Sequence, residues 1–458
     1  MGATVDVAAF ASGRGAAAGG RTTEFGRALV DTVGCALAGR ASAPEALVRQ
    51  WIAHEGTVGR STVWTTGDQV SASQAALANG TAAHALDWDD VSPRGAFHPS
   101  VVLLPALVAC AEETGAGGPV LASAYDVGAA VFRAVADVLP RAEHYRRGWH
   151  TTATVGRLAA VAGLANLARL DETATRNALG LVASLAGGSR ANFGTMTKPL
   201  HAGVAARDAV MAVGLASGGF TANTSQLEAE GGFFALYGAP TKGGLDGLAA
   251  DLEHWRTAWP TDWALKRFPA CYATHRAVDA ALDLRDELAG RLPQRLEVVV
   301  EPGGLRPLID YQPVTGAEAR FSMAYSVAAA VVHGSLRLEH FETAPLSDPR
   351  VRALMASVEV READIPPFGE PSFADGFSTL TAELSSGDVC RRRVDITYGD
   401  ARNPMSEADV EAKFDDCCGA AGVAEADASQ LIAVLRRLPT GCVDGLREAL
   451  QAGRDGPA

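Results

Sequence analysis

The chain has 458 residues, 48% of them hydrophobic, and a formal net charge of −13 at pH 7. This length predicts roughly two or three domains, and the apolar content is sufficient for a large buried core. The acidic balance argues against nucleic acid or an anionic membrane as a partner. A small anionic substrate is not excluded, because the local field of a pocket can oppose the global charge.

No apolar run reaches the roughly 18 residues that a membrane-spanning helix needs, and the N-terminal stretch lacks an apolar signal core. The seven cysteines form no Cys-x-x-Cys pair, which is typical of reduced thiols. The sequence also lacks a His-Glu-x-x-His motif, a phosphate-binding loop and a dinucleotide fingerprint. We therefore expect a cytoplasmic protein with no membrane segment and no metal site.

The first 264 residues predict one helix after another. Alanine-rich segments with helical periodicity recur, and glycine, serine and proline mark the breaks between them. No run of β-branched residues predicts a strand in this half. The expected helices cover 24–39, 74–86, 99–113, 124–138, 152–168, 173–186 and 199–217. We assign residues 1–264 to an all-α helical domain.

Residues 265–400 have a different character. RLEVVVEP (295–302) predicts a strand, and 351–364 predict a helix that runs into a strand. The stretch 378–399 predicts a hairpin around a Ser-Ser-Gly-Asp turn. With helices expected at 273–290 and 317–334, this segment predicts a smaller α+β domain.

Helices return in residues 401–458, where Ser406 and Asp409 form a capping-box pattern. This C-terminal segment is expected to rejoin the helical domain. The predicted fold is therefore mainly α, a large all-α helical domain with an inserted smaller α+β domain.

Basic side chains stand near the start of four predicted helices. His98 occupies a predicted N-cap before a proline, and His150 directly precedes another helix. Lys198 precedes a proline with His201 in the first turn, and Lys266 precedes a proline-led turn into the fourth helix. A helix N-terminus attracts anions and disfavours cations by up to about 1 kcal/mol. The pattern suggests a site for a multiply charged anion if the four starts converge, and scattered helix starts otherwise.

The stretch HALDWDDVSPRGAFHPS (84–100) places Asp87, Asp89 and Asp90 between His84 and His98. Three interpretations are open: a metal site, a solvated loop between helices, or a carboxylate that orients a histidine or lysine. The ligand spacing does not favour a metal site. A carboxylate that orients His98 fits its position eleven residues after Asp87. His84, alone on an alanine-rich helix, is expected to be structural.

Six ordered stretches resemble the MmgE/PrpD family, which includes 2-methylcitrate dehydratase, cis-aconitate decarboxylase and iminodisuccinate epimerase. They are HALDWDD with FHPS, GWHTTATVG, NFGTMTKPLHAGVAAR, KRFPACYATH, EARFSMAYSVA and GDARNPMSEADVEAKF, between about residues 22 and 420. The resemblance implies a helical domain with a lid domain, a homodimer, and no metal or organic cofactor. It also implies a site between the two domains for a substrate with two or three carboxylates.

Three cationic positions match this family. Lys198 matches the lysine of a Thr-Lys-x-x-His-Ala-Gly motif, His201 stands beside it, and Lys266 matches the lysine that opens the lid. The family's reactions pass through a carbanion or enediolate next to a carboxylate, so cations must hold negative charge. We expect these three side chains to bind substrate carboxylates, and Lys198 also to be catalytic.

Proton transfer in such a reaction needs a positioned acid or base. By the resemblance, His98 and His150 match the family's site histidines, and Asp87 matches the first acid of its Asp-aromatic-Asp-Asp motif. We expect the two histidines to move the proton, with Asp87 setting the state of His98. Cys271 is a further acid–base candidate, because a thiol near cations titrates lower. A buried structural thiol is the alternative.

Two departures bear on the reaction. Val91 and Cys271 stand where the decarboxylase branch has a threonine and a histidine, and GWHTTAT, NFGTMTKP and CYATH resemble the epimerase branch. The leading hypothesis is a cofactor-independent lyase that dehydrates or decarboxylates a small di- or tricarboxylate. One alternative is an isomerase that epimerises a substituted succinate such as iminodisuccinate. The other is a catalytically silent binding protein, against which the retained histidines and lysines argue.

Overall fold

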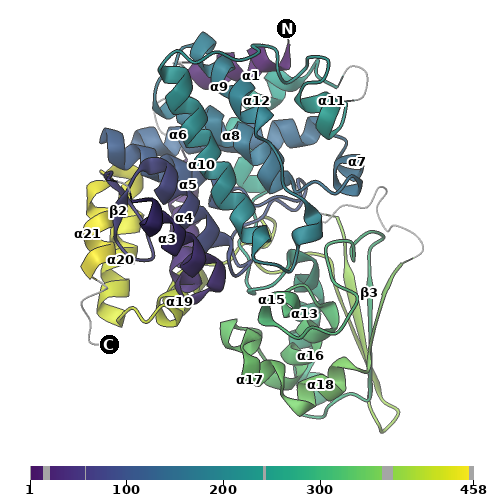
Figure 1. Ribbon diagram of the computed structural model, residues 1–458. Helices are drawn as coiled ribbons and strands as arrows, with labels where there is room; N and C mark the ends of the chain where they lie inside the picture. The colour runs from purple at the N-terminus through teal and green to yellow at the C-terminus, as the bar shows by residue number, and fades with distance from the viewer. Residues whose placement is uncertain (1, 14–20, 57, 241–243, 364–374, 453–458) are drawn as a thin grey trace.

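The computed structural model describes residues 2–13, 21–56, 58–240, 244–363 and 375–452. The described chain is mainly helical, with one two-stranded and one four-stranded sheet. Figure 1 shows most helices gathered in one body, and the larger sheet with its helices in a second group. The buried apolar residues form one large cluster in each group.

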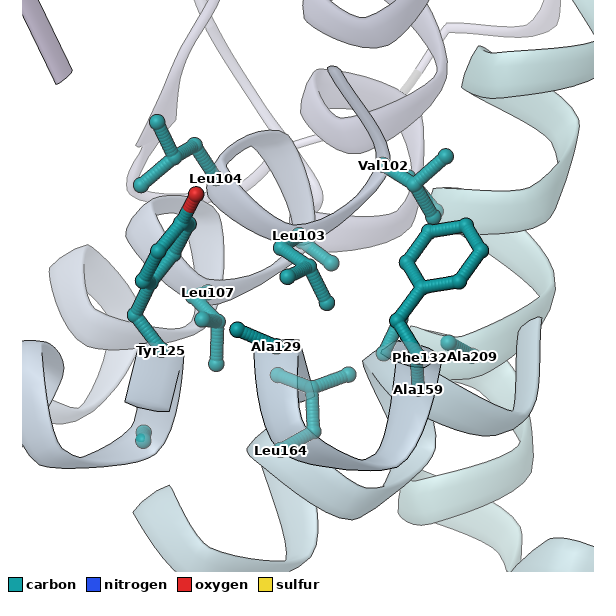
Figure 2. Close-up of a cluster of buried hydrophobic side chains, with 14 of the residues drawn as sticks. Val102, Leu103, Leu104, Leu107, Tyr125, Ala129, Phe132, Ala159, Leu164 and Ala209 are labelled. Atoms are coloured by element: carbon teal, nitrogen blue, oxygen red, sulfur yellow. The ribbon is translucent and has the colours of Figure 1, made fainter. Parts of the chain in front are cut away.

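The core of the first group is built by four helices: α5 (Ser100–Thr114), α6 (Gly118–Val138), α8 (Thr151–Leu167) and α10 (Thr197–Ser217). Most residues of α5 are buried on every side, because helices cover it all round. Figure 2 shows side chains of these helices packed together, among them Val102, Leu103, Leu104, Leu107, Tyr125, Ala129, Phe132, Ala159, Leu164 and Ala209.

All seven helices expected in the first half are present, the other three being α2 (Thr22–Ala38), α4 (Ala72–His84) and α9 (Glu172–Ser184). The expectation that this half holds no strand was wrong, because β1 (Ser61–Thr62) and β2 (Gln69–Val70) form a short antiparallel pair. The helices that the sequence did not predict are α1 (Ala3–Ser12), α3 (Ala43–Glu55), α7 (Arg141–Arg146), α11 (Phe233–Tyr237) and α12 (Leu248–Ala258).

Helix α6 is, within the described residues, the one helix long and apolar enough to cross a membrane. Of its most apolar window, 78% is buried inside the protein. A core helix passes the same test of length and composition, so α6 is weak evidence for a membrane span.

Helices α4 and α10 pack closely against each other. A Cβ atom added to Gly203 would lie 2.3 Å from the carbonyl of Leu77 and 2.3 Å from Oγ1 of Thr81. One added to Gly80 would lie 2.8 Å from Cα of Gly203. These glycines allow the two backbones to touch. The contact sets the loop after α4 opposite the first turn of α10.

The larger sheet has the strand order β4-β3-β5-β6. β3 (Arg295–Val300) pairs in parallel with β4 (Val358–Glu362) and antiparallel with β5 (Ser378–Glu383). β5 and β6 (Val389–Val394) form the predicted hairpin. Alternate residues of β3 are buried, because one face of the sheet packs against helices. The strands expected from the sequence in this region are confirmed.

Two helices expected in this region are each interrupted. The segment 273–290 divides into α13 (Tyr272–Asp283) and α14 (Arg285–Leu288), and 317–334 into α15 (Gly316–Ala319) and α16 (Met323–His333). In the second case the side chain of Ser322 accepts a hydrogen bond from the backbone N–H of Tyr325 and so starts a new helix. The break leaves Phe321 outside a helix, where it faces the candidate site.

The C-terminal helices are α19 (Glu407–Ala420), α20 (Glu425–Arg437) and α21 (Asp444–Ala452). The predicted capping box of Ser406 and Asp409 begins α19. α19 packs against α2, and side chains of all three helices belong to the first apolar cluster. Figure 1 shows these yellow helices beside the purple N-terminal ones. The second cluster contains only residues between Phe268 and Leu384.

Candidate functional site

Asp87 lies in the loop after α4 and holds two buried lysines. Lys198, in the first turn of α10, donates a hydrogen bond to Oδ1 of Asp87. Nζ of Lys266 lies 3.0 Å from Oδ2 and donates to the backbone carbonyl of Asp87 at 2.6 Å. Burial alone would raise the pKa of Asp87, but the two ammonium groups outweigh it and hold the pKa well below its usual range. The centre is therefore an anion between two cations.

Asp89 joins two histidines in the same loop. Its carboxylate oxygens lie 2.9 Å from Nδ1 of His84 and 2.8 Å from Nδ1 of His98. The same Nδ1 of His98 is 3.1 Å from the carbonyl oxygen of Asp90, which only accepts hydrogen bonds. Nδ1 of His98 therefore carries the hydrogen, and its Nε2, 3.8 Å from Oδ1 of Asp87, holds the lone pair of the neutral ring.

Burial keeps these imidazoles neutral. It lowers the pKa of His98 and brings the pKa of His84 to about 4. Burial opposes the ionisation of Asp89 as well, but the two neighbouring histidines hold its pKa well below the usual range. An ionised carboxylate that orients a neutral histidine is the arrangement of a general acid–base pair.

His150 and His201 form a second histidine pair. His150 is the N-cap of α8, and its Nδ1 lies 3.1 Å from Nδ1 of His201 on α10. In a hydrogen bond between two neutral rings, one Nδ1 carries the hydrogen and the other Nδ1 accepts it. Burial lowers the pKa of His150 well below its usual value, Lys198 adds to this, and the pKa of His201 falls to about 4.

A cavity joins these groups and opens to solvent, and about 510 Å³ of space, the open part included, is free of protein atoms. Its polar wall consists of Asp87, His98, His150 and Lys198. The less polar side includes Val91, Tyr145, Phe193, Cys271, Tyr272, Pro307 and Phe321. The lining comes from both groups of elements, because residues after 270 belong to the part that carries the sheet.

Comparison with known proteins identifies the family. The MmgE/PrpD N-terminal domain matches residues 21–243, and the MmgE/PrpD C-terminal domain matches residues 268–437. The chain belongs to the MmgE/PrpD family. It is 32% identical over 401 residues to a human cis-aconitate decarboxylase, covering 85% of this chain and 81% of that protein. It is similar to the mouse enzyme of that name at 32% (85% and 80% covered) and to one from Aspergillus terreus at 26% (85% and 84%).

Two of the predicted carboxylate-binding residues of this MmgE/PrpD protein lie behind the cavity wall. Lys266 is fully buried against Asp87, and His201 lies behind His150, and neither is part of the lining. That Lys266 and His201 bind substrate carboxylates stays a prediction. Lys266 contacts Asp87 and His201 contacts His150, and both of these partners line the cavity.

The pKa of Cys271 is raised overall and not lowered as expected. The thiol lines the cavity, but burial raises its pKa to about 11, and the charge of Asp87 raises it further. The charges of Lys266 and Lys198 lower this pKa, but burial raises it by more. Cys271 is a neutral thiol at physiological pH.

The interpretation of 84–100 as a solvated loop was also wrong, because Asp87, Asp89 and Asp90 are all buried. The possible metal ligands do converge, unlike the spacing suggested. One ligand atom each from His84, Asp87, Asp89 and His98 lies within 4.8 Å of the others. Each of these carboxylates is already engaged, however. A metal ion would have to displace the ammonium groups at Asp87, so the set as built suits proton transfer.

Sequence reasoning left Asp89 unassigned and treated His84 as structural. The signal that would have found them is their spacing: His84 ends α4, and Asp89 follows five residues later in a tight loop. His98 stands one position before the N-cap of α5, which is Pro99. The aromatic residues Phe193 and Phe321 had no signal, since only the tertiary fold brings them to the cavity.

Proposed function

We propose that this MmgE/PrpD protein is a lyase that decarboxylates a small unsaturated tricarboxylate, with cis-aconitate as the first candidate. The similar proteins named above are cis-aconitate decarboxylases, which favours the lyase over the epimerase hypothesis. The observation that carries the proposal is the pairing of His98 and Lys198 on one cavity wall, each held by its own buried aspartate.

The reaction follows from these positions. One carbon–carboxylate bond breaks, CO₂ leaves, and the electron pair stays on the allylic carbons. Lys198 stabilises this charge through a remaining carboxylate. The proton that neutralises the carbanion comes from Nε2 of His98. The resting ring is neutral, so it takes that proton from solvent when the anionic substrate binds, and Asp89 stabilises the imidazolium.

The two departures from the decarboxylase pattern, Val91 and Cys271, both line the cavity. Neither takes part in the contacts of Lys198 with Asp87 or of His98 with Asp89. We therefore propose that these two residues influence which tricarboxylate binds, and that they do not change which bond breaks.

The proposal extends to the assembly. We propose that residues 265–400 act as a lid on a helical domain of residues 1–264 and 401–458. We also propose that the protein is a cytoplasmic homodimer that needs no metal or organic cofactor, as the family resemblance implies. Light scattering during gel filtration tests the dimer, and activity after exhaustive chelation tests the metal.

The function is tested with purified protein and cis-aconitate in D₂O. We expect CO₂ release and a product that carries deuterium at the newly protonated carbon. His98→Gln should lower kcat by on the order of 10²–10⁴, because proton transfer is lost. Lys198→Ala should lower it by on the order of 10²–10³, because the developing charge loses its cation.

His54→Gln is the matched control, since His54 is exposed on α3 and no part of the cavity. Circular dichroism confirms that each variant is folded. Full turnover by a folded Lys198→Ala protein would contradict the site. Loss of optical rotation in a substituted succinate, with solvent deuterium entering it and no CO₂ release, would replace the lyase by an epimerase.

A further inference from the structure

A second hollow adjoins the cavity and is rich in arginine. It is lined by Glu143, Tyr145, Arg146, Arg190 and Arg306, and its empty volume is about 970 Å³. Tyr145 lines both spaces, so the outer hollow and the inner cavity share a wall. Arg306 belongs to the chain segment that carries the sheet, and the other four residues belong to the helical part.

The cationic groups of this hollow are largely uncompensated. The only acid in its lining, Glu143, is paired with Arg147, whose Nε lies 3.0 Å from its carboxylate. Arg146 and Arg306 are exposed, and among the described residues neither side chain has a hydrogen-bond or ion-pair partner. Such a positive patch on a chain of net charge −13 creates a local field that attracts anions.

Arg190 is held by contacts with Tyr145 and Arg306. Its guanidinium carbon lies 3.2 Å from the centre of the Tyr145 ring, and Nη2 donates to the carbonyl of Arg306 at 3.2 Å. Its Nε is buried and has no hydrogen-bond partner among the described residues. The contact joins the helical part to the segment of Arg306, directly beside the inner cavity.

The inner cavity cannot by itself neutralise a tricarboxylate. Lys198 and Lys266 carry two positive charges, and Asp87 and Asp89 carry two negative ones, while the resting histidines are neutral and His98 gains one proton when the anionic substrate binds. Arg320, whose buried guanidinium is close enough to Asp87 to interact with its charge, adds one positive charge. With Arg320 and protonated His98 counted, one of the three negative charges of a tricarboxylate stays unmatched, and the arginines of the adjoining outer hollow can supply the missing cation.

We propose that the outer hollow is a carboxylate-binding subsite, in which Arg146 and Arg306 bind the outermost carboxylate of a polycarboxylate whose other end reaches Lys198. A guanidinium fits a carboxylate through two parallel N–H donors. Tyr145 lines both this subsite and the cavity, and the guanidinium of Arg190 packs against its ring. This inference rests on the proposed function for the identity of the substrate, but the subsite is testable without turnover.

The test measures binding of propane-1,2,3-tricarboxylate, an unreactive saturated tricarboxylate, by calorimetry at several salt concentrations. We expect the double variant Arg146→Gln/Arg306→Gln to bind at least about tenfold more weakly than wild type. The salt dependence of Kd should also become shallower, because two charges are lost. Arg146→Lys/Arg306→Lys should recover part of the affinity, since it keeps the charge and loses the paired donors.

Arg391→Gln is the matched control, because Arg391 is an exposed arginine on β6 and lines neither space. The subsite is overturned if wild type does not bind the tricarboxylate, or if the Arg146/Arg306 double variant binds as well as Arg391→Gln. If binding depends on these arginines but cis-aconitate is not consumed, the proposed function fails and the subsite stands. If cis-aconitate is consumed and its KM is unchanged in the double variant, the subsite fails and the proposed function stands.

Discussion

Asp87 combines two unusual features at one residue. Its backbone is left-handed (φ 53°), and its carboxylate is the partner of two buried ammonium groups. Aspartate and asparagine tolerate this backbone better than other side chains. The loop conformation and the charge balance therefore depend on the same side chain, and substitution by asparagine separates them.

Asp87→Asn should keep the loop shape and leave Lys198 and Lys266 without a counter-charge. We expect the free energy of unfolding to fall by about 3–5 kcal/mol, the cost of breaking a buried ion pair from one side. Urea unfolding at pH 7 measures it. Asp283→Asn, at an exposed carboxylate on α13, should change stability by less than about 0.5 kcal/mol. Equal effects of the two substitutions would contradict the ion-pair account.

The pKa of His84 makes stability depend on pH in a defined direction. The pKa is about 4 in the folded protein and roughly 6.5 in an unfolded chain. As the pH falls through 6.5, the unfolded chain binds a proton that the folded protein does not, so the folded state loses stability until about pH 4. The folded state therefore keeps its full stability above pH 6.5, and the stability that it loses between pH 6.5 and pH 4 corresponds to about 3 kcal/mol.

This prediction is measured as a difference between wild type and His84→Gln, which removes the titration and keeps a hydrogen-bond donor for Asp89. Relative to the variant, wild type should lose about 2 kcal/mol between pH 7.0 and 5.0. Other titrating groups cancel in this difference. A difference that stays constant with pH would show that His84 is not the group responsible.

At the scale of the element, the contact of α4 with α10 decides the geometry of the site. The chain positions of the helices were predictable, since all seven expected helices of the first half are present. The contact between α4 and α10 could not be predicted from the sequence, because Gly80 and Gly203 bring the two backbones together only in the folded protein. Likewise, the break at Ser322 is a capping interaction within an otherwise continuous helical pattern.

Gly203→Ala should disturb both stability and activity. The added methyl would lie 2.3 Å from the backbone of α4, so the helices must separate, at a typical cost of about 1–3 kcal/mol. Lys198, one turn earlier on α10, would move relative to Asp87, and kcat should fall. Gly214→Ala on the same helix has open space and should be neutral or stabilising by up to about 1 kcal/mol. Similar unfolding midpoints for the two variants would contradict this packing.

At the scale of the whole molecule, the two apolar clusters are the main division. The first includes residues from both ends of the chain, and the second lies between Phe268 and Leu384. The cavity is lined from both parts, so a ligand inside it would contact both of them. Tryptophan fluorescence reports on the first part, because all seven tryptophans precede residue 265.

We predict that the two parts unfold in separable steps. Val298→Ala removes buried methyl groups from β3 and should destabilise the second cluster by about 1–3 kcal/mol. The loss of β-structure followed by circular dichroism should then precede the tryptophan transition, whose midpoint should move by less than about 1 °C. Saturating propane-1,2,3-tricarboxylate should bring the two transitions together, because it binds both parts. Coincident shifts in both signals without ligand would indicate a single cooperative unit.

The sequence by itself determined the mainly helical composition, the hairpin of β5 and β6, the family and the short stretches that carry chemistry, because these depend on local periodicity and nearby residues. Only the tertiary structure decided what each charged group does. It buried Asp87 against Lys198 and Lys266, gave Asp89 rather than Asp87 to Nδ1 of His98, and left Cys271 a neutral thiol. The reason is physical: a pKa and an ion pair depend on distances between distant segments and on exclusion of water, which spacing along the chain does not specify.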